Sequence, residues 1–179
     1  KGHSVRVAEY AVAIAHEMGE SEHAIERLEY AALLHDLGKV GVRRSLLLKS
    51  SRLSQEESDE IRRHPEVGAH ILESVRYLED IVPIIRSHHE RVDGAGYGEG
   101  LRGDAIPLQA RILAVGDAFD GMTSQRPYRS AMPQAEALPE IATGAGTAFH
   151  PEGVAAFLAM LRPGGTRTLG LSVGGAPGA

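Results

Sequence analysis

AALLHDLGK, residues 31–39, carries an ionisable pair, His35 and Asp36, at the end of an apolar segment. Apolar residues recur at helical spacing over residues 22–36, and His35 falls on the same face as they do. Burying such a pair is costly unless the charges are paired or bound to a metal. We therefore predict a helix over 22–36 that enters the core and presents a polar pair there.

The same helical spacing continues through most of the chain. Besides 22–36, the predicted helices cover residues 4–18, 55–63, 65–74, 79–90, 108–121, 133–143 and 151–161. Ser54 and Glu57 form a capping-box pattern at the start of one of them. Alternating β-type segments are nearly absent. We predict an all-α fold, a single helical bundle domain of about seven or eight helices over residues 1–161, followed by a flexible Gly/Pro-rich tail over 162–179.

The composition of the 179-residue chain is that of a globular protein, with 42% hydrophobic and 24% charged residues. No apolar run is long enough to span a membrane, so we expect no membrane insertion by this domain. A net charge of −5 argues against binding of a nucleic acid polymer, which requires a basic surface. The lack of cysteine indicates a reducing compartment, here the cytoplasm, and excludes thiolate metal ligands. Lys1 is not an initiator residue, so we expect the chain to be part of a longer protein.

A glycine-rich loop follows a second pair of polar residues. His88 and His89 end an apolar segment, and the loop over residues 91–106 holds five glycines around Tyr97. A stretch of this length without regular structure is uncommon unless it has a function. A packed core does not require it, so we interpret the region as a metal site with a substrate loop over it.

Histidine and aspartate emerge from apolar settings in four separate helices. Taken singly, a His-Asp or His-His pair carries little information in a chain with nine histidines. Asp117 alone could be a buried carboxylate that accepts helix-cap hydrogen bonds. Together, five histidines and two aspartates could hold two metal ions and leave positions open for water. A bridging carboxylate would hold the ions about 3.5–4 Å apart, an arrangement that supports hydrolysis of a phosphate ester.

These motifs resemble a known family. HDLGKVG, from His35, resembles the HD superfamily of metal-dependent phosphohydrolases. HHERVDGAGYG, from His88, and ILAVGDAFDGMTSQRPYR, from Ile112, resemble its HD-GYP subgroup. The resemblance covers residues 1–161 and implies an HD-type helical domain with a two- or three-metal centre. The implied activity is hydrolysis of cyclic di-GMP to pGpG or on to GMP, with Fe or Mn as the expected metal and Zn or Ni as alternatives.

The resemblance assigns roles residue by residue. The implied metal ligands are His3, His35, Asp36, His64, His88, His89 and Asp117. Asp36 is the expected catalytic bridge between the ions. Lys39 is the expected catalytic lysine that faces the phosphate, although a cation near a helix C-terminus is favourable in any protein. The implied reaction is in-line attack of a metal-bridging hydroxide on phosphorus.

Further residues are implied to bind the substrate together with Lys39: Gly96, Tyr97, Arg126 and Arg129. Glycine lets the backbone approach the nucleotide closely, and Tyr97 offers a ring and a hydroxyl. Arginines hold phosphate as forked donors. Without the resemblance, the arginine pair would be interpreted as an exposed charge cluster.

Some positions depart from the family pattern. Gly98 stands where the family has proline, which we expect to loosen the loop. His150 stands where the family often has aspartate, a better helix N-cap, and Arg43 stands where a proline is common. The glutamate that three-metal members use would precede Lys1, so the number of ions, two or three, stays open.

Two alternatives to the cyclic di-GMP phosphodiesterase remain. The first is a catalytically weak or inactive domain that binds cyclic di-GMP and signals to a partner. The second is a phosphodiesterase for another cyclic dinucleotide. The resemblance also implies an upstream sensory or receiver domain and a homodimer. His16, His23 and His70 lie outside every motif, and we expect them at the surface.

Overall fold

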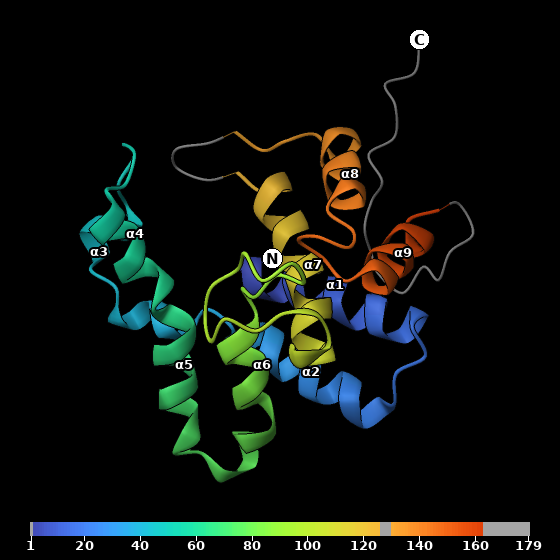
Figure 1. Ribbon diagram of the computed structural model, residues 1–179, viewed down its shortest axis with the longest axis horizontal. Helices are drawn as coiled ribbons and strands as arrows, with labels where there is room; N and C mark the ends of the chain where they lie inside the picture. Colours follow the sequence, from blue (N-terminus) through green and yellow to red (C-terminus); the bar gives the residue numbers. More distant parts are fainter. Residues whose placement is uncertain (1, 126–129, 163–179) are drawn as a thin grey trace.

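The computed structural model describes residues 2–125 and 130–162 (Figure 1). It confirms the all-α fold, because these residues contain no strand and only one isolated β-bridge, between Ala145 and Phe149. The elements are α1 (His3–Glu17), α2 (Glu22–Leu34), η1 (Leu37–Gly41), α3 (Arg44–Leu47), α4 (Gln55–Arg62), α5 (His64–Glu73), η2 (Arg76–Ile81), α6 (Val82–Ser87), η3 (Gly103–Ala105), α7 (Leu108–Thr123), α8 (Gln134–Thr143) and α9 (Pro151–Met160).

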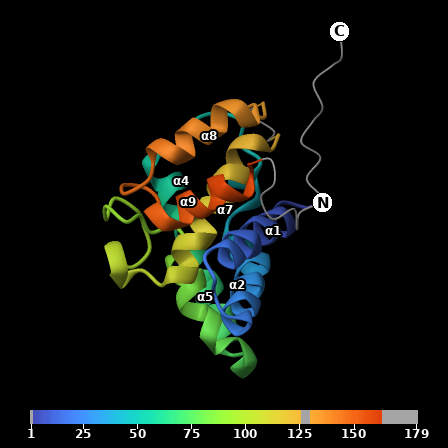
Figure 2. The ribbon, with the colours of Figure 1, turned by 90° about the vertical axis from the view of Figure 1, so that its right-hand side faces the viewer.

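The core lies where α1 packs against α2, α7 and α9 (Figure 2). Ile14, Leu28 and Phe157 have no exposed surface there. The Tyr10 ring meets Phe119 edge to face at 5.3 Å between centroids, a favoured aromatic geometry. Burial of these apolar faces holds the beginning of α1 and the middle of α7 close together.

A second contact brings η1 against α5. Gly38 makes it possible, because a Cβ atom at this position would lie 1.9 Å from the carbonyl oxygen of His64 and 2.5 Å from the backbone nitrogen of Gly68. No side chain fits in that space. The close approach brings the residues just after α2 directly beside the first turn of α5.

Most predicted helices are present, with differences at their ends. The capping box at Ser54 and Glu57 is complete. The predicted helix over 79–90 is instead the 3-10 helix η2 followed by the short α6, because Pro83 lies in the first turn of a new helix and lacks the N–H that a continuous helix needs. The four-residue α3 was not predicted.

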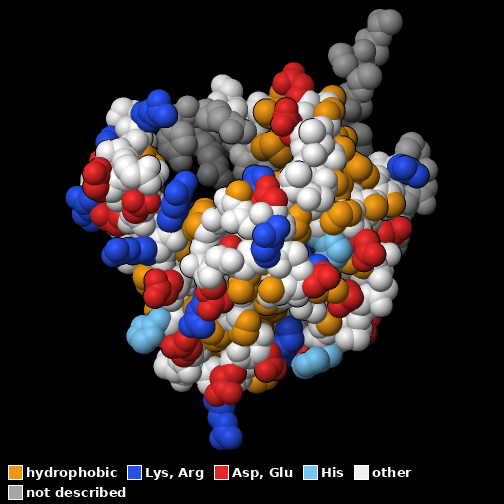
Figure 3. All heavy atoms as spheres, in the orientation of Figure 1, with side chains coloured by type: hydrophobic (Ala, Val, Ile, Leu, Met, Phe, Trp, Pro, Cys, Tyr) orange, Lys and Arg blue, Asp and Glu red, His pale blue; other side chains and the backbone are white. Residues whose placement is uncertain are grey.

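The remaining expectations concern the surface and the chain ends. Acidic and basic side chains are interspersed over the face drawn in Figure 3. None of the described helices is both long and apolar enough to cross a membrane. His16, His23 and His70 are exposed, as expected. The predicted tail lies outside the described residues, apart from Arg162.

Candidate metal centre

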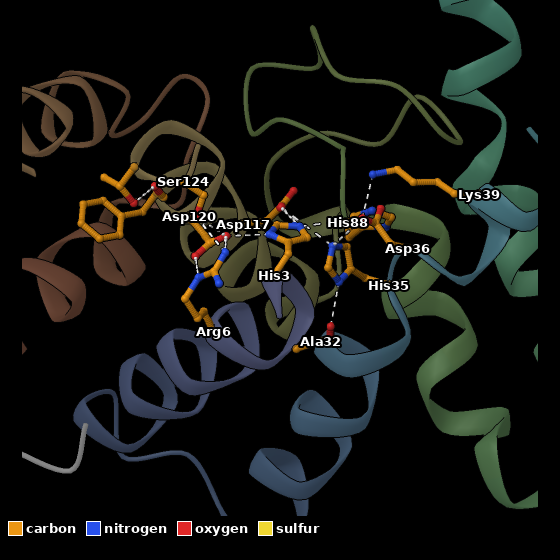
Figure 4. Close-up of polar contacts among 12 residues, drawn as sticks. His3, Arg6, Ala32, His35, Asp36, Lys39, His88, Asp117, Asp120 and Ser124 are labelled. Carbon is orange, nitrogen blue, oxygen red and sulfur yellow. Dashed lines mark hydrogen bonds and ion pairs between the residues drawn. The ribbon is translucent and has the colours of Figure 1, made fainter. Parts of the chain in front are cut away.

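The structure brings the seven predicted metal ligands together from five parts of the chain (Figure 4 labels five of them). They come from the first turn of α1, the end of α2, the start of α5, the end of α6 and the middle of α7. Six of them form two groups, in each of which one ligand atom per residue lies within 4.8 Å of the others: His3, His35 and Asp117, and His64, His88 and His89.

Asp36 lies between the two groups. Its Oδ2 is 3.6 Å from Nε2 of His35 and 3.7 Å from Nε2 of His3. Its Oδ1 is 3.5 Å from Nε2 of His64. Each carboxylate oxygen therefore faces a different group, which is the orientation that a bridging ligand needs.

Backbone carbonyls orient three of the histidine rings. Each ring places Nδ1 next to the carbonyl three residues earlier: His35 on Ala32 at 2.7 Å, His64 on Ile61 at 2.8 Å and His88 on Ile85 at 2.6 Å. A carbonyl only accepts hydrogen bonds, so Nδ1 carries the proton in each ring. The Nε2 lone pairs then point into the centre, as in metal-binding histidines.

These lone pairs fit a divalent metal ion. Nε2 of His35 is buried and has no hydrogen-bond partner among the described residues. Nε2 of His64 is 3.3 Å from Nε2 of His88, so two acceptor atoms face each other. A buried acceptor without a partner is costly, and two opposed lone pairs repel. A cation bound by these atoms removes both penalties.

Burial keeps the second histidine group uncharged at neutral pH. It lowers the pKa of His64, lowers the pKa of His88 to about 3, and holds the pKa of His89 well below its usual value. Metal ligation requires neutral imidazole. This group is therefore in the binding-competent protonation state without having to lose protons.

The first group is different because a proton lies in it. Hydrogen bonds to Asp117 and Asp120 raise the pKa of His3 to about 9. Burial acts to raise the pKa of Asp117, but the hydrogen bond from His3 and the nearby histidines outweigh it, so this pKa stays far below its usual value. Binding of a cation at Nε2 of His3 would release the proton.

Asp120 is a site residue that the motifs did not reveal. Its Oδ2 lies 2.7 Å from Nδ1 of His3, and its side chain is buried. Arg6 donates to the same carboxylate at 2.5 Å, and Ser124 donates to it at 3.0 Å. A carboxylate on the outer nitrogen of a histidine fixes the ring for metal binding. The available signal was a second aspartate three residues after Asp117, on the same side of a helix.

Lys39 lies at the edge of the centre. Its Nζ is 2.7 Å from Oδ2 of Asp36. Burial acts to raise the pKa of Asp36, but the nearby His35 and the charge and hydrogen bond of Lys39 outweigh it and lower that pKa. The side chain of Lys39 is 35% exposed, so its ammonium group can also reach a ligand from solvent.

The glycine-rich loop lies over the second histidine group. The Tyr97 ring stacks on His89, with 4.7 Å between centroids and 29° between the planes. A cavity of about 390 Å³ lies beside this stack and is lined by His88, His89, Gly96, Tyr97 and Asp117, among others. The predicted substrate residues Gly96 and Tyr97 therefore lie beside the metal ligands, whereas Arg126 and Arg129 lie outside the described residues.

Comparison with known proteins adds a family model and several relatives. The HD domain model matches residues 1–153. The chain is 41% identical over 155 residues to the cyclic di-GMP phosphodiesterase response regulator RpfG of Xanthomonas campestris. The aligned region covers 86% of this chain and 41% of the relative. It is 39% identical over 155 residues to the 3'3'-cGAMP-specific phosphodiesterase 3 of Vibrio cholerae. That aligned region covers 87% of this chain and 34% of the relative. The chain thus spans less than half the length of these relatives.

Two solved structures have a similar fold. Bd1817, an HDG"Y"P protein from Bdellovibrio bacteriovorus, superposes with a TM-score of 0.71 at 23% identity, over 87% of this chain and 50% of that one. The cyclic GMP-AMP phosphodiesterase V-cGAP3 of Vibrio cholerae superposes with a TM-score of 0.68 at 24% identity, over 87% of this chain and 42% of that one. At this identity the likeness establishes the fold alone.

Proposed function

Because the chain belongs to the HD domain family, we propose that it is a metal-dependent phosphodiesterase that hydrolyses cyclic di-GMP to pGpG or on to GMP. The observation that carries the proposal is the position of Asp36, whose two oxygens face different groups of candidate ligands. A carboxylate shared in this way suits a pair of ions rather than a single structural ion.

One ion would be held by His3, His35 and Asp117, the other by His64, His88 and His89, with Asp36 shared between them. Such ions lower the pKa of a bound water and neutralise charge on phosphate oxygens. Nitrogen and oxygen donors without thiolate suit Fe or Mn, and also accept Zn or Ni. A third ion would depend on a residue before Lys1.

The protein's own groups bind and orient the substrate. Lys39 would donate a hydrogen bond from Nζ to a phosphate oxygen and stabilise the charge that develops there. The Tyr97 ring forms one side of the cavity, and Gly96 lets the backbone approach the ligand. Arg126 and Arg129 would contact phosphate as forked donors, on the evidence of their motif alone.

Relatives support the substrate class and leave one second candidate. RpfG is named for cyclic di-GMP and the Vibrio cholerae relative for 3'3'-cGAMP, so 3'3'-cGAMP is the other substrate to test. A domain that binds without turnover is disfavoured because all seven candidate ligands are present and grouped. We further propose a cytoplasmic protein with an upstream receiver or sensory domain, as the words "response regulator" in the name of RpfG suggest, and a homodimer.

The first experiment is a turnover assay of purified protein loaded with Mn²⁺, or with Fe²⁺ under anaerobic conditions. Cyclic di-GMP and 3'3'-cGAMP are supplied separately, products are separated by chromatography, and bound metal is measured by elemental analysis. Appearance of pGpG or GMP is the expected result. Absence of product from fully metal-loaded protein that still binds the ligand would overturn the proposal in favour of a receptor.

Asp36→Ala tests the bridging role. We expect it to lose bound metal and to lower kcat by more than about 100-fold. Replacing a residue that only hydrogen-bonds to a metal ligand already lowers metal affinity or activity by about 10–100-fold, and Asp36 is itself a candidate ligand. Asp80→Ala, at an exposed position on η2, is the matched control and should leave both values unchanged. Turnover and metal content that survive in Asp36→Ala would exclude the bridge.

A further inference from the structure

Glu90 is a buried carboxylate that the proposed reaction does not use. It follows His89 directly, and only 4% of the residue is exposed. Burying a carboxylate is costly unless it accepts hydrogen bonds. Its Oε1 accepts two, from the backbone N–H of Glu99 at 2.6 Å and of Gly100 at 2.7 Å. Glu90 therefore connects the segment just after α6 to residues 99 and 100 of the glycine-rich loop.

Hydrogen bonds hold the loop in place at Tyr97 itself and shortly after it. The backbone N–H of Tyr97 donates to the carbonyl oxygen of His89 at 3.2 Å. The two hydrogen bonds to Glu90 hold residues 99 and 100. The ring that stacks on His89 thus belongs to a residue whose own N–H is bound and which lies two residues before the hydrogen bonds to Glu90.

The fit around Tyr97 is tight, so these hydrogen bonds determine where the ring lies. A Cβ atom at Gly96 would lie 2.6 Å from the carbonyl oxygen of His89. Gly98 has φ +139°, and a Cβ atom there would lie 2.9 Å from the carbonyl oxygen of Arg86 and 3.0 Å from Oε1 of Glu90. The loop therefore lies directly on the backbone at the end of α6, with little room to shift while the hydrogen bonds persist.

Tyr97 also lines two neighbouring cavities. One is the cavity of about 390 Å³ over the metal ligands, and the other, of about 540 Å³, is lined by Arg62, Arg86 and Gly98 among others. Tyr97 and Arg62 line both, and the Arg62 guanidinium lies 5.4 Å from the centre of the Tyr97 ring. Movement of the ring would remove one wall of the cavity over the metal ligands.

We propose that Glu90 is a positioning residue that holds the Gly-Tyr-Gly loop so that Tyr97 stays on His89 and forms the wall against which the cyclic dinucleotide binds. This inference rests on the proposed function for the identity of the ligand. Oε2 of Glu90 has no hydrogen-bond partner among the described residues, so the carboxylate's hydrogen bonds are those to the loop. Glu90→Gln keeps an oxygen in the place of Oε1, and Glu90→Ala removes it.

The test is a double-mutant cycle with cyclic di-GMP. KM, kcat, metal content and melting temperature are measured for the wild type, Glu90→Ala, Glu90→Gln, Tyr97→Ala and the double variant Glu90→Ala/Tyr97→Ala. Glu99→Ala is the control, because it removes a nearby exposed charge and leaves the backbone N–H in place. Glu90→Ala is expected to raise KM by about 10-fold, with kcat and metal content within about twofold, since residues in one network couple.

Glu90→Gln is expected to return KM to within about threefold of the wild type, because neutral hydrogen bonds replace charge-assisted ones. The double variant should be no worse than Tyr97→Ala, because the effect of Glu90 passes through that ring. Additive effects on KM, or loss of metal together with kcat, would overturn the proposal and make Glu90 a support for the histidines instead.

Amide hydrogen exchange gives a readout that needs no turnover. The N–H groups of Glu99 and Gly100 should be protected in the wild type and Glu90→Gln, and should exchange faster in Glu90→Ala. If the wild type hydrolyses no cyclic dinucleotide but this exchange pattern holds, the proposed function fails, whereas the role of Glu90 in positioning the loop is supported. Unchanged exchange of the Glu99 and Gly100 N–H groups in Glu90→Ala would refute the positioning role of Glu90, whatever the substrate is.

Discussion

At the level of single residues, the centre depends on which nitrogen of each histidine faces inward. Backbone carbonyls accept hydrogen bonds from Nδ1–H of His35, His64 and His88, and this directs Nε2 to the centre. His3 uses a side chain instead, since Asp120 lies on its Nδ1. A carbonyl of the protein backbone cannot be changed by substitution, whereas a carboxylate can. Asp120 is therefore the residue at which the orientation of a ligand can be tested.

Asp120→Asn should weaken the first metal group by about 10–100-fold, because a neutral amide orients the His3 ring less firmly than a carboxylate does. The measurement is a titration against a competing chelator that resolves two sites. Asp104→Asn is the control, because that carboxylate is almost fully exposed and pairs only with Arg111 among the described residues. Equal weakening of both sites would mean that Asp120 supports the fold and not one ligand.

At the level of elements, the glycine-rich loop has a backbone that proline cannot adopt. Gly98 has φ +139°, whereas proline holds φ near −65°. The sequence suggested that glycine loosens the loop at this position. The structure gives another reason for it: the chain passes in contact with Arg86 and Glu90, where a Cβ atom does not fit.

Gly98→Pro, which restores the family residue, should therefore impair this protein. We expect a loss of about 1–3 kcal/mol in the free energy of unfolding, from backbone strain, and a higher KM. Gly98→Ala should show a smaller loss in the same direction, because alanine is strained there without losing its N–H. Denaturant unfolding and steady-state kinetics give both values. A lower KM in Gly98→Pro would indicate that the loop binds substrate in another conformation.

His150, which directly precedes α9, is a position where a substitution should stabilise the protein. His150 is the N-cap, but its side chain makes no capping hydrogen bond, and its Nδ1 is buried without a partner among the described residues. His150→Asp should raise the free energy of unfolding by about 0.5–2 kcal/mol, because aspartate caps the first turn. His150→Ala removes the ring without adding a cap and should give no such gain. Equal stability of the two variants would contradict the capping argument.

At the level of the whole molecule, the metal centre joins segments that are far apart in the sequence. The candidate ligands come from α1, α2, α5, α6 and α7 or their ends, and α1 contacts α2, α7 and α9 in the core. Metal that binds only the folded chain must stabilise it. Removal of metal should therefore lower the melting temperature of the domain as one unit.

The stability of the metal-free protein should also depend on pH. His88 has a folded pKa of about 3 against 6.5 when unfolded, so below pH 6.5 the unfolded state binds a proton that the folded state does not. Stability should fall as pH drops from 6.5 toward 3. His3, raised to about 9, acts oppositely, and its contribution is lost as pH rises from 6.5 through 9.

Urea unfolding in the presence of chelator, from about pH 4 to 9, measures this dependence. The expected curve has its maximum near neutral pH, because the two contributions decline on opposite sides. His23→Gln is the control, since it removes an exposed histidine that lies outside the metal centre. A metal-free stability that is constant between pH 4 and 7 would mean that the histidine group is not buried in solution.

Local information in the sequence determined the all-α fold and most helix ranges, and the resemblance of its motifs to a known family supplied the set of candidate ligands. Helical periodicity and residue chemistry are properties of neighbouring residues, so they can be read without knowing the packing. The same local signals missed the break at Pro83 and the short α3, because packing and a ring constraint decide short helices.

Tertiary structure alone decided how the ligands are grouped and which residues hold them. The division into two groups with Asp36 between them joins residues as far apart as His3 and Asp117. The roles of Asp120 and Glu90 depend on a ring and a loop placed against them by other elements. Distances between remote residues follow from the packing of whole helices, and spacing along the chain carries no record of them.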